Sequence, residues 1–144
     1  MASINQTVII RTDLFGPEDV GLLSAQVAHI HFEIMRQFFR NNLIDDEDVI
    51  NSKLSNNFSN VGLVKEWMED PYLLVKQVPN LEALAYFIEE AMIKDIIVNK
   101  WYDTVYVRLS KTQQKAFPNV LVGASFGPDD ADKIRTILGD LPLL

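Results

Sequence analysis

Polar side chains that could support acid–base or ester chemistry occur in two separate stretches of the sequence. The first stretch contains Asp13, Gln26 and His29. The second is the polar run 110–115, which contains Ser110, Lys111, Thr112 and Lys115. A carboxylate, an imidazole and hydroxyls can orient water or move protons, and an ammonium group stabilises developing negative charge. We therefore treat these residues as one candidate cleft.

The two histidines are not expected to share a metal ion. On a helical wheel, His31 falls beside the apolar residues Val27 and Met35, whereas His29 falls with Glu33 on the polar face. We expect His31 to be buried and hydrogen-bonded, and His29 either to pair with Glu33 or to belong to a site. The sequence has no cysteine, which excludes thiol catalysis and Cys-ligated zinc. No metal site and no cofactor are expected.

The candidate residues also have structural interpretations. Asp13 and Gln26 could hold a strand-to-helix turn through hydrogen bonds from side chain to backbone. Ser110 is a weak candidate for a nucleophile, because Ser110 and Lys111 would point to opposite faces if a strand continued through them.

The hydrophobic pattern predicts strands that alternate with helices. The predicted strands are 7–12, 72–78, 103–109 and 118–126. The predicted helices are 21–40, 81–94 with Asn80 as its cap, and a last one capped by Asp129 or Asp130 and ended by Gly139. Segment 41–60 is interpreted as an acidic surface excursion with a short helix near 49–54. This alternation predicts one α/β domain over residues 1–144.

Charge is distributed unevenly along the chain. Residues 104–128 contain Arg108, Lys111 and Lys115 and no acid, a balance of +3, which leaves −10 for the rest because the total is −7. An acidic body argues against a broad nucleic-acid surface. The basic residues are either an anion site or a solvated loop. No apolar stretch approaches the roughly 18 residues of a membrane span, and no signal segment begins the chain, so a cytoplasmic location is expected.

The order and spacing of several motifs resemble the type II peptidyl-tRNA hydrolase family. The similar stretches are Arg11-Thr12-Asp13-Leu14, Ser24-Ala25-Gln26-Val27-Ala28-His29, Trp67 ahead of the 72–78 strand, Gly127-Pro128, and the ending Gly139-Asp140-Leu141-Pro142-Leu143-Leu144. The resemblance implies a three-layer fold, in which helices cover both faces of a four-stranded mixed sheet, and it allows a homodimer. It also implies hydrolysis of the ester between a peptide and tRNA, which needs a cation and a carboxylate with hydroxyls.

The catalytic residues of that family are not found at the matching positions. Leu22 stands where the family has a lysine before its first helix. Counting back without gaps from Gly127-Pro128, Ser110 replaces an aspartate, Gln114 replaces a threonine and Val122 replaces a later threonine.

Two functions remain open on the sequence. The first is a catalytically degenerate protein that acts as a binding or interaction module for tRNA, a peptide or another protein. The alternative is a divergent hydrolase whose catalytic groups have moved, with Lys111 or Lys115 as the cation and His29 nearby.

Overall fold

The computed structural model describes residues 3–43 and 61–144. The elements are β1 (Ile4–Arg11), a short 3₁₀ helix η1 (Pro17–Asp19), α1 (Val20–Leu43), α3 (Val61–Glu69), β2 (Tyr72–Val78), α4 (Leu81–Ile93), β3 (Val98–Arg108), β4 (Gln114–Asp130) and α5 (Ala131–Leu138). Helix α1 continues to Leu43, so the first three residues of the predicted excursion 41–60 are helical instead. The rest of that acidic segment, residues 44–60, lies outside the described residues, as does the helix predicted near 49–54. None of the helices in the described ranges is long and apolar enough to cross a membrane.

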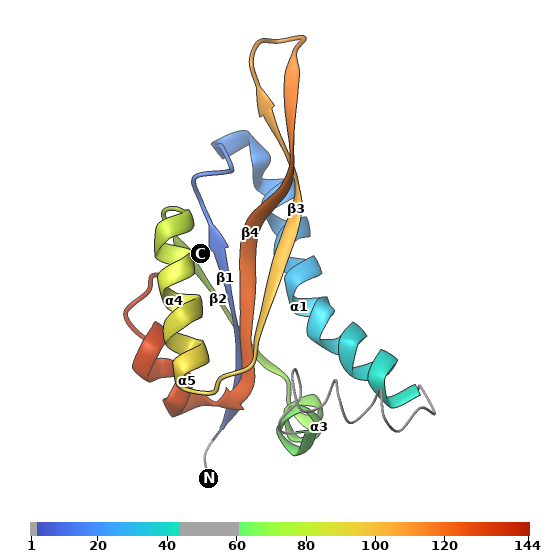
Figure 1. The fold of residues 1–144 in the computed structure, drawn as a ribbon, viewed down its shortest axis with the longest axis vertical. Coiled ribbons are helices and arrows are strands. Elements are labelled where there is room, and N and C mark those ends of the chain that lie inside the picture. Colours follow the sequence, from blue (N-terminus) through green and yellow to red (C-terminus); the bar gives the residue numbers. More distant parts are fainter. Residues whose placement is uncertain (1–2, 44–60) are drawn as a thin grey trace.

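The strands form one mixed sheet in the order β2-β1-β4-β3 (Figure 1). β1 runs parallel to β2 and antiparallel to β4, and β3 pairs antiparallel with β4. In this register Val8 lies beside Val75 of β2 and Ser125 of β4. The predicted four-stranded mixed sheet is therefore confirmed.

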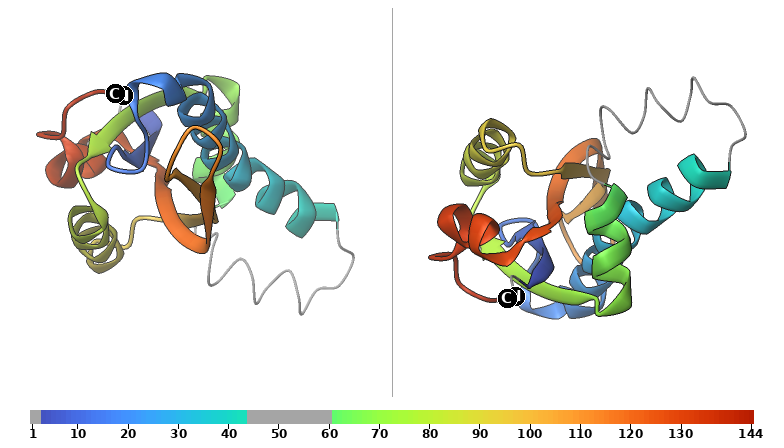
Figure 2. Two further views of the ribbon diagram at one scale, coloured as in Figure 1. Left: turned by 90° about the horizontal axis from the view of Figure 1, so that it is seen from above. Right: turned by 90° about the horizontal axis from the view of Figure 1, so that it is seen from below.

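Helices cover both faces of the sheet (Figure 2). Because successive strand residues point to opposite faces, Val8 and Ile10 pack with Ile30 of α1 on one side. Ile9 packs on the other side with Leu84 of α4 and Ile134 of α5. β1 is buried from Asn5 to Arg11, as expected for a strand covered on both faces. The predicted three-layer α/β arrangement is confirmed.

The strands are longer than their apolar runs suggested. β1 begins at Ile4 rather than at residue 7, because polar residues extend it at its start. β3 begins at Val98, and β4 spans Gln114–Asp130 rather than 118–126. The far ends of β3 and β4 form a hairpin that projects beyond the helices (Figure 1), and residues 106–119, here called the arm, are all exposed. The predicted strand 103–109 covers the β3 side of the arm, whereas residues 114–117 of β4 have no buried face and no apolar alternation, and were missed.

The helix ends agree well with the sequence, whereas one helix face does not. Asn80 Oδ1 accepts a hydrogen bond from the Ala83 amide and caps α4, and Asp130 caps α5. In α4 the buried residues are Leu84, Ile88 and Ala91. The spacing of Leu81, Leu84, Ala85, Ile88 and Met92 predicts one buried side of this helix. Leu81, Ala85 and Met92 are exposed instead, Leu81 and Met92 because they lie at the two ends of the helix. Helix α3 was not predicted.

His31 is hydrogen-bonded, as predicted, but it is half-buried rather than fully buried. Its Nδ1 lies at hydrogen-bond distance from Gln6 Oε1, and the Trp67 ring meets it edge-on with the centroids 5.8 Å apart. Removal of the ring from water disfavours its charged form and lowers the pKa of His31.

We expect the fold to lose stability in mild acid through His31. Below the unfolded pKa of about 6.5, the unfolded chain binds a proton that the folded chain does not, so the free energy of unfolding falls as the pH drops towards the lowered folded pKa. Urea unfolding from about pH 7.5 to about pH 5 measures this loss. His31→Gln should show a shallower pH dependence over that range, and an identical slope in both proteins would contradict the assignment.

Candidate functional site

A cleft of ≈430 Å³ lies between the loop after β1, the start of α1 and the base of the arm. Its described lining consists of Asp13, Leu14, Phe15, Gly16, Glu18, Asp19, Leu22, Val105, Tyr106, Val107, Arg108 and Gln114. Three of the lining residues carry carboxylates, and Arg108 is the one positively charged residue in this described lining. The cleft therefore combines an acidic rim with apolar and aromatic side chains.

Local hydrogen bonds fix the loop that forms one wall of the cleft. The Phe15 amide donates to the Thr12 carbonyl, and the Gly16 amide donates to Asp19 Oδ2 at 2.9 Å. Pro17 at the start of η1 suits a first helical turn, where an amide proton has no partner. The chain then enters α1, and Leu22 lies in the cleft with 59% of its surface exposed.

Asp13 is bound by a neighbouring guanidinium. Arg11 Nε and Nη2 donate to the two Asp13 oxygens at 3.0 and 2.7 Å, and Arg11 Nη1 donates to the Leu121 carbonyl of β4 at 3.1 Å. The predicted bonds from Asp13 to the backbone were thus wrong, because Arg11 at the end of β1 satisfies the carboxylate. A bidentate partner makes Asp13 a poor general base.

Gln26 ties α1 to β3 rather than to its own turn, so the predicted side-chain to backbone bond was wrong here too. Its Oε1 accepts from Trp101 Nε1 at 2.7 Å, and its Nε2 donates to Asp103 Oδ2 at 2.9 Å. His29 stacks on the Trp101 ring, with the centroids 5.3 Å apart and the planes 7° from parallel. Glu33 pairs with Arg36 at 2.6 Å. Neither Gln26 nor His29 belongs to the described lining of the cleft.

The loop residues lie at the far end of the arm. Ser110 Oγ accepts from the Thr112 and Gln113 amides at 3.3 and 3.1 Å, so this hydroxyl closes the turn. Lys115 Nζ sits 5.1 Å from the centre of the Phe117 ring. Because β3 ends at Arg108, Ser110 and Lys111 lie in the turn rather than on a strand. Ser110, Lys111, Thr112 and Lys115 are exposed and do not line the cleft.

The structure therefore divides the predicted cleft into three places. Asp13 joins Leu22 and Gln114 in the actual cleft, Gln26 and His29 contact β3, and the four loop residues occupy the arm. Val122 is fully buried in the core. No group of three or more histidine and acidic side chains in the described ranges is placed to hold a metal ion.

Sequence reasoning missed the partners of Gln26. Trp101 and Asp103 lie 75 and 77 residues further along the chain, and no local pattern connects them to α1. It also did not place Arg108 in the cleft, although it recognised the residue as part of a basic stretch. The signal that could have placed Arg108 was its position near the end of the predicted strand 103–109, next to the candidate site.

The architecture defines the class of protein to which the chain belongs. A parallel β1–β2 pair, extended by β4 and β3 and covered by helices on both faces, is a mixed α/β fold with a cleft at one end of the sheet. A family model described as "Peptidyl-tRNA hydrolase PTH2" matches residues 4–144, and the chain belongs to this family. The comparison with curated proteins found no match.

Proposed function

We propose that this member of the peptidyl-tRNA hydrolase PTH2 family is catalytically degenerate and uses the cleft to bind a peptide segment. The charge of the cleft carries the proposal: besides Asp13, whose charge Arg11 compensates, its described lining holds Glu18 and Asp19 against the single cation Arg108. A tRNA acceptor end presents phosphates, which such a lining repels.

The positions that match the family's catalytic residues support loss of the hydrolytic reaction. Leu22 brings an aliphatic side chain to the cleft where a lysine is expected, and Gln114 occupies a threonine position. Ser110 and Val122 lie outside the cleft, one in the turn of the arm and one in the core. With both its oxygens held by Arg11, Asp13 is poorly placed to activate a water molecule.

The same lining suits a basic and apolar peptide. Leu14, Phe15 and Val107 offer apolar surface, while Glu18 at the exposed rim offers a carboxylate to a lysine or arginine side chain. Pockets of this kind gain affinity from the apolar contacts and orientation from a few polar groups.

A divergent hydrolase is the second candidate, and Arg108 is the observation that favours it. Its guanidinium lines the cleft together with Leu22 and could replace the missing cation. Lys111 and Lys115, the cations proposed from the sequence, lie outside the described lining. If the protein is a hydrolase of this kind, its turnover depends on Arg108. A peptide-binding module has no turnover for the loss of Arg108 to affect.

We expect the protein to bind a fluorescent peptide of alternating lysine and leucine more tightly than its glutamate–leucine counterpart. Replacement of the rim carboxylate in Glu18→Lys should weaken binding of the lysine peptide about fivefold, since one exposed charge is reversed. Fluorescence anisotropy at moderate salt measures both affinities. Glu89→Lys, an equal charge change on exposed α4, is the matched control.

Two results would contradict the peptide proposal. One is equal binding of the two peptides, and the other is an equal loss of affinity in Glu18→Lys and Glu89→Lys, which would reflect net charge alone.

A further inference from the structure

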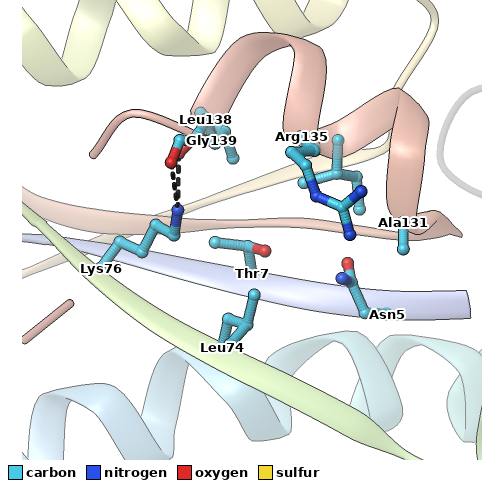
Figure 3. A pocket seen from close by; sticks show the side chains of 9 residues that line it. Asn5, Thr7, Leu74, Lys76, Ala131, Arg135, Leu138 and Gly139 are labelled. Atoms are coloured by element: carbon cyan, nitrogen blue, oxygen red, sulfur yellow. Dashed lines mark hydrogen bonds between the residues drawn. The ribbon is translucent and has the colours of Figure 1, made fainter. Parts of the chain in front are cut away.

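A second, smaller pocket of ≈110 Å³ lies on the opposite face of the sheet from α1, between α5 and the strands β1 and β2 (Figure 3). Its lining consists of Asn5, Thr7, Leu74, Lys76, Ala131, Ile134, Arg135, Leu138 and Gly139. None of these residues lines the cleft described above.

Lys76 is a buried cation at one end of this pocket. The residue is 9% exposed, and its Nζ donates to the Leu138 and Gly139 carbonyls at 2.8 and 3.2 Å (Figure 3). An ammonium group has three donors, so one remains after these two bonds. In the described part of the chain no carboxylate pairs with Lys76, although buried charges usually have a charged or strongly polar partner.

Asn5 supplies an unsatisfied acceptor to the same pocket. The residue is 4% exposed, and its Oδ1 has no hydrogen-bond partner among the described residues. Figure 3 shows the Asn5 amide and the Thr7 hydroxyl on the sheet side of the pocket, with the Arg135 guanidinium above Asn5. A buried polar atom without a hydrogen bond is costly to the fold, and a bound group that donates to it would recover that cost.

Arg135 adds a second positive charge at the rim. One of its nitrogens, Nη1, bonds to Asp132 Oδ1 at 2.7 Å, and a guanidinium has five N–H donors in all. Asp129, beside Asn5 in the sheet, is paired with Lys133 at 3.2 Å and does not line the pocket. The pocket therefore combines two cations, a hydroxyl and one free acceptor.

We propose that this pocket binds a phosphate group that retains one P–OH. Its oxygens accept from Lys76, Thr7 and Arg135, and its hydroxyl donates to Asn5 Oδ1. Inorganic phosphate and phosphate monoesters carry such a hydroxyl in their less ionised forms, whereas sulfate at neutral pH does not. The pocket, with a volume of ≈110 Å³, has room for a group of this size.

Titration of the ¹⁵N-labelled protein with inorganic phosphate, glycerol phosphate and sulfate at constant ionic strength tests the proposal. We expect saturable amide shifts at residues 74–76 and 131–139 with phosphate, and tighter binding of phosphate than of sulfate. Tighter binding of inorganic phosphate identifies the free ion as the ligand, and tighter binding of glycerol phosphate identifies a phosphate monoester.

Two variants show whether the shifts come from the pocket. Thr7→Val keeps the shape of the side chain but removes its hydroxyl, and Arg135→Gln removes an exposed charge. Each variant should bind phosphate about tenfold more weakly. Arg36→Gln is the matched control, because Arg36 pairs with Glu33 three residues before it just as Arg135 pairs with Asp132. Lys76 is kept because it also binds the last carbonyls of α5.

Phosphate binding that is weakened about tenfold in both pocket variants and unchanged in Arg36→Gln supports the site. Shifts that do not saturate, sulfate that binds as tightly as phosphate, or equal binding by all three variants would overturn the proposal.

Discussion

Gly123→Ala is expected to lower the free energy of unfolding by about 3 kcal/mol. A Cβ atom at this position would lie 2.5 Å from the Ile9 carbonyl oxygen and 2.8 Å from Ile30 Cδ1. The Ile30 side chain can shift, but the Ile9 backbone is fixed in the ladder between β1 and β4. The glycine thus allows α1 to pack closely on the sheet, which sets the position of the helix that forms the cleft.

Gly21→Ala is the control for this experiment. Gly21 lies in an exposed part of α1, and a Cβ atom added there would meet nothing within 4 Å, so alanine should raise the free energy of unfolding by about 0.5–1 kcal/mol. Urea unfolding followed by circular dichroism measures both changes. If Gly123→Ala retains the stability of the unsubstituted protein, the Ile9 carbonyl of β1 and Ile30 of α1 do not approach Gly123 as described.

Trp67→Ala should cost about 3–5 kcal/mol of unfolding free energy, the usual range for removal of a buried aromatic side chain. Trp67 of α3 is 2% exposed, its Nε1 donates to the Tyr72 carbonyl at 3.0 Å, and its ring meets His31. The substitution leaves a cavity and an unpaired carbonyl beside the start of β2.

Phe32→Ala is the comparison for Trp67, because it also removes an aromatic ring but from an exposed position on α1. It should change the free energy of unfolding by less than about 1 kcal/mol. Circular dichroism is the suitable signal, since tryptophan fluorescence would itself be altered. Equal losses in the two variants would mean that Trp67 is not part of the core.

The parts of the fold that the sequence predicted are those with a buried apolar pattern or a local cap. β2 was predicted with its observed bounds, Tyr72–Val78, because five of its seven residues are apolar or aromatic and Pro79 follows it directly. The cap at Asn80 is a contact between residues three apart, which a sequence motif can reveal.

The parts that were missed depend on distant contacts or on exposed backbone pairing. The β4 side of the arm was missed because it is held by backbone pairing with β3, as between Val107 and Lys115, and its own residues carry no apolar alternation. In the site, the sequence assigned Asp13 and Gln26 to local backbone bonds, whereas Arg11 and Trp101 bind them. Which side chains meet across a sheet depends on the strand order and register. The sequence predicted the strands but not the register that brings these partners together.

Lys76 illustrates a signal that was present but not used. A lysine that follows four apolar or aromatic residues in a predicted strand must either reach solvent or find buried acceptors. The structure gives it the carbonyls at the end of α5, a segment that follows it by more than sixty residues.

Release of tRNA from a peptidyl-tRNA substrate tests the central claim most directly, with an active member of the family assayed beside this protein. We predict release equal to that in buffer alone, from a protein that circular dichroism shows to be folded. Turnover above that background, abolished in Arg108→Gln, would contradict the account and identify a divergent hydrolase with Arg108 as its cation.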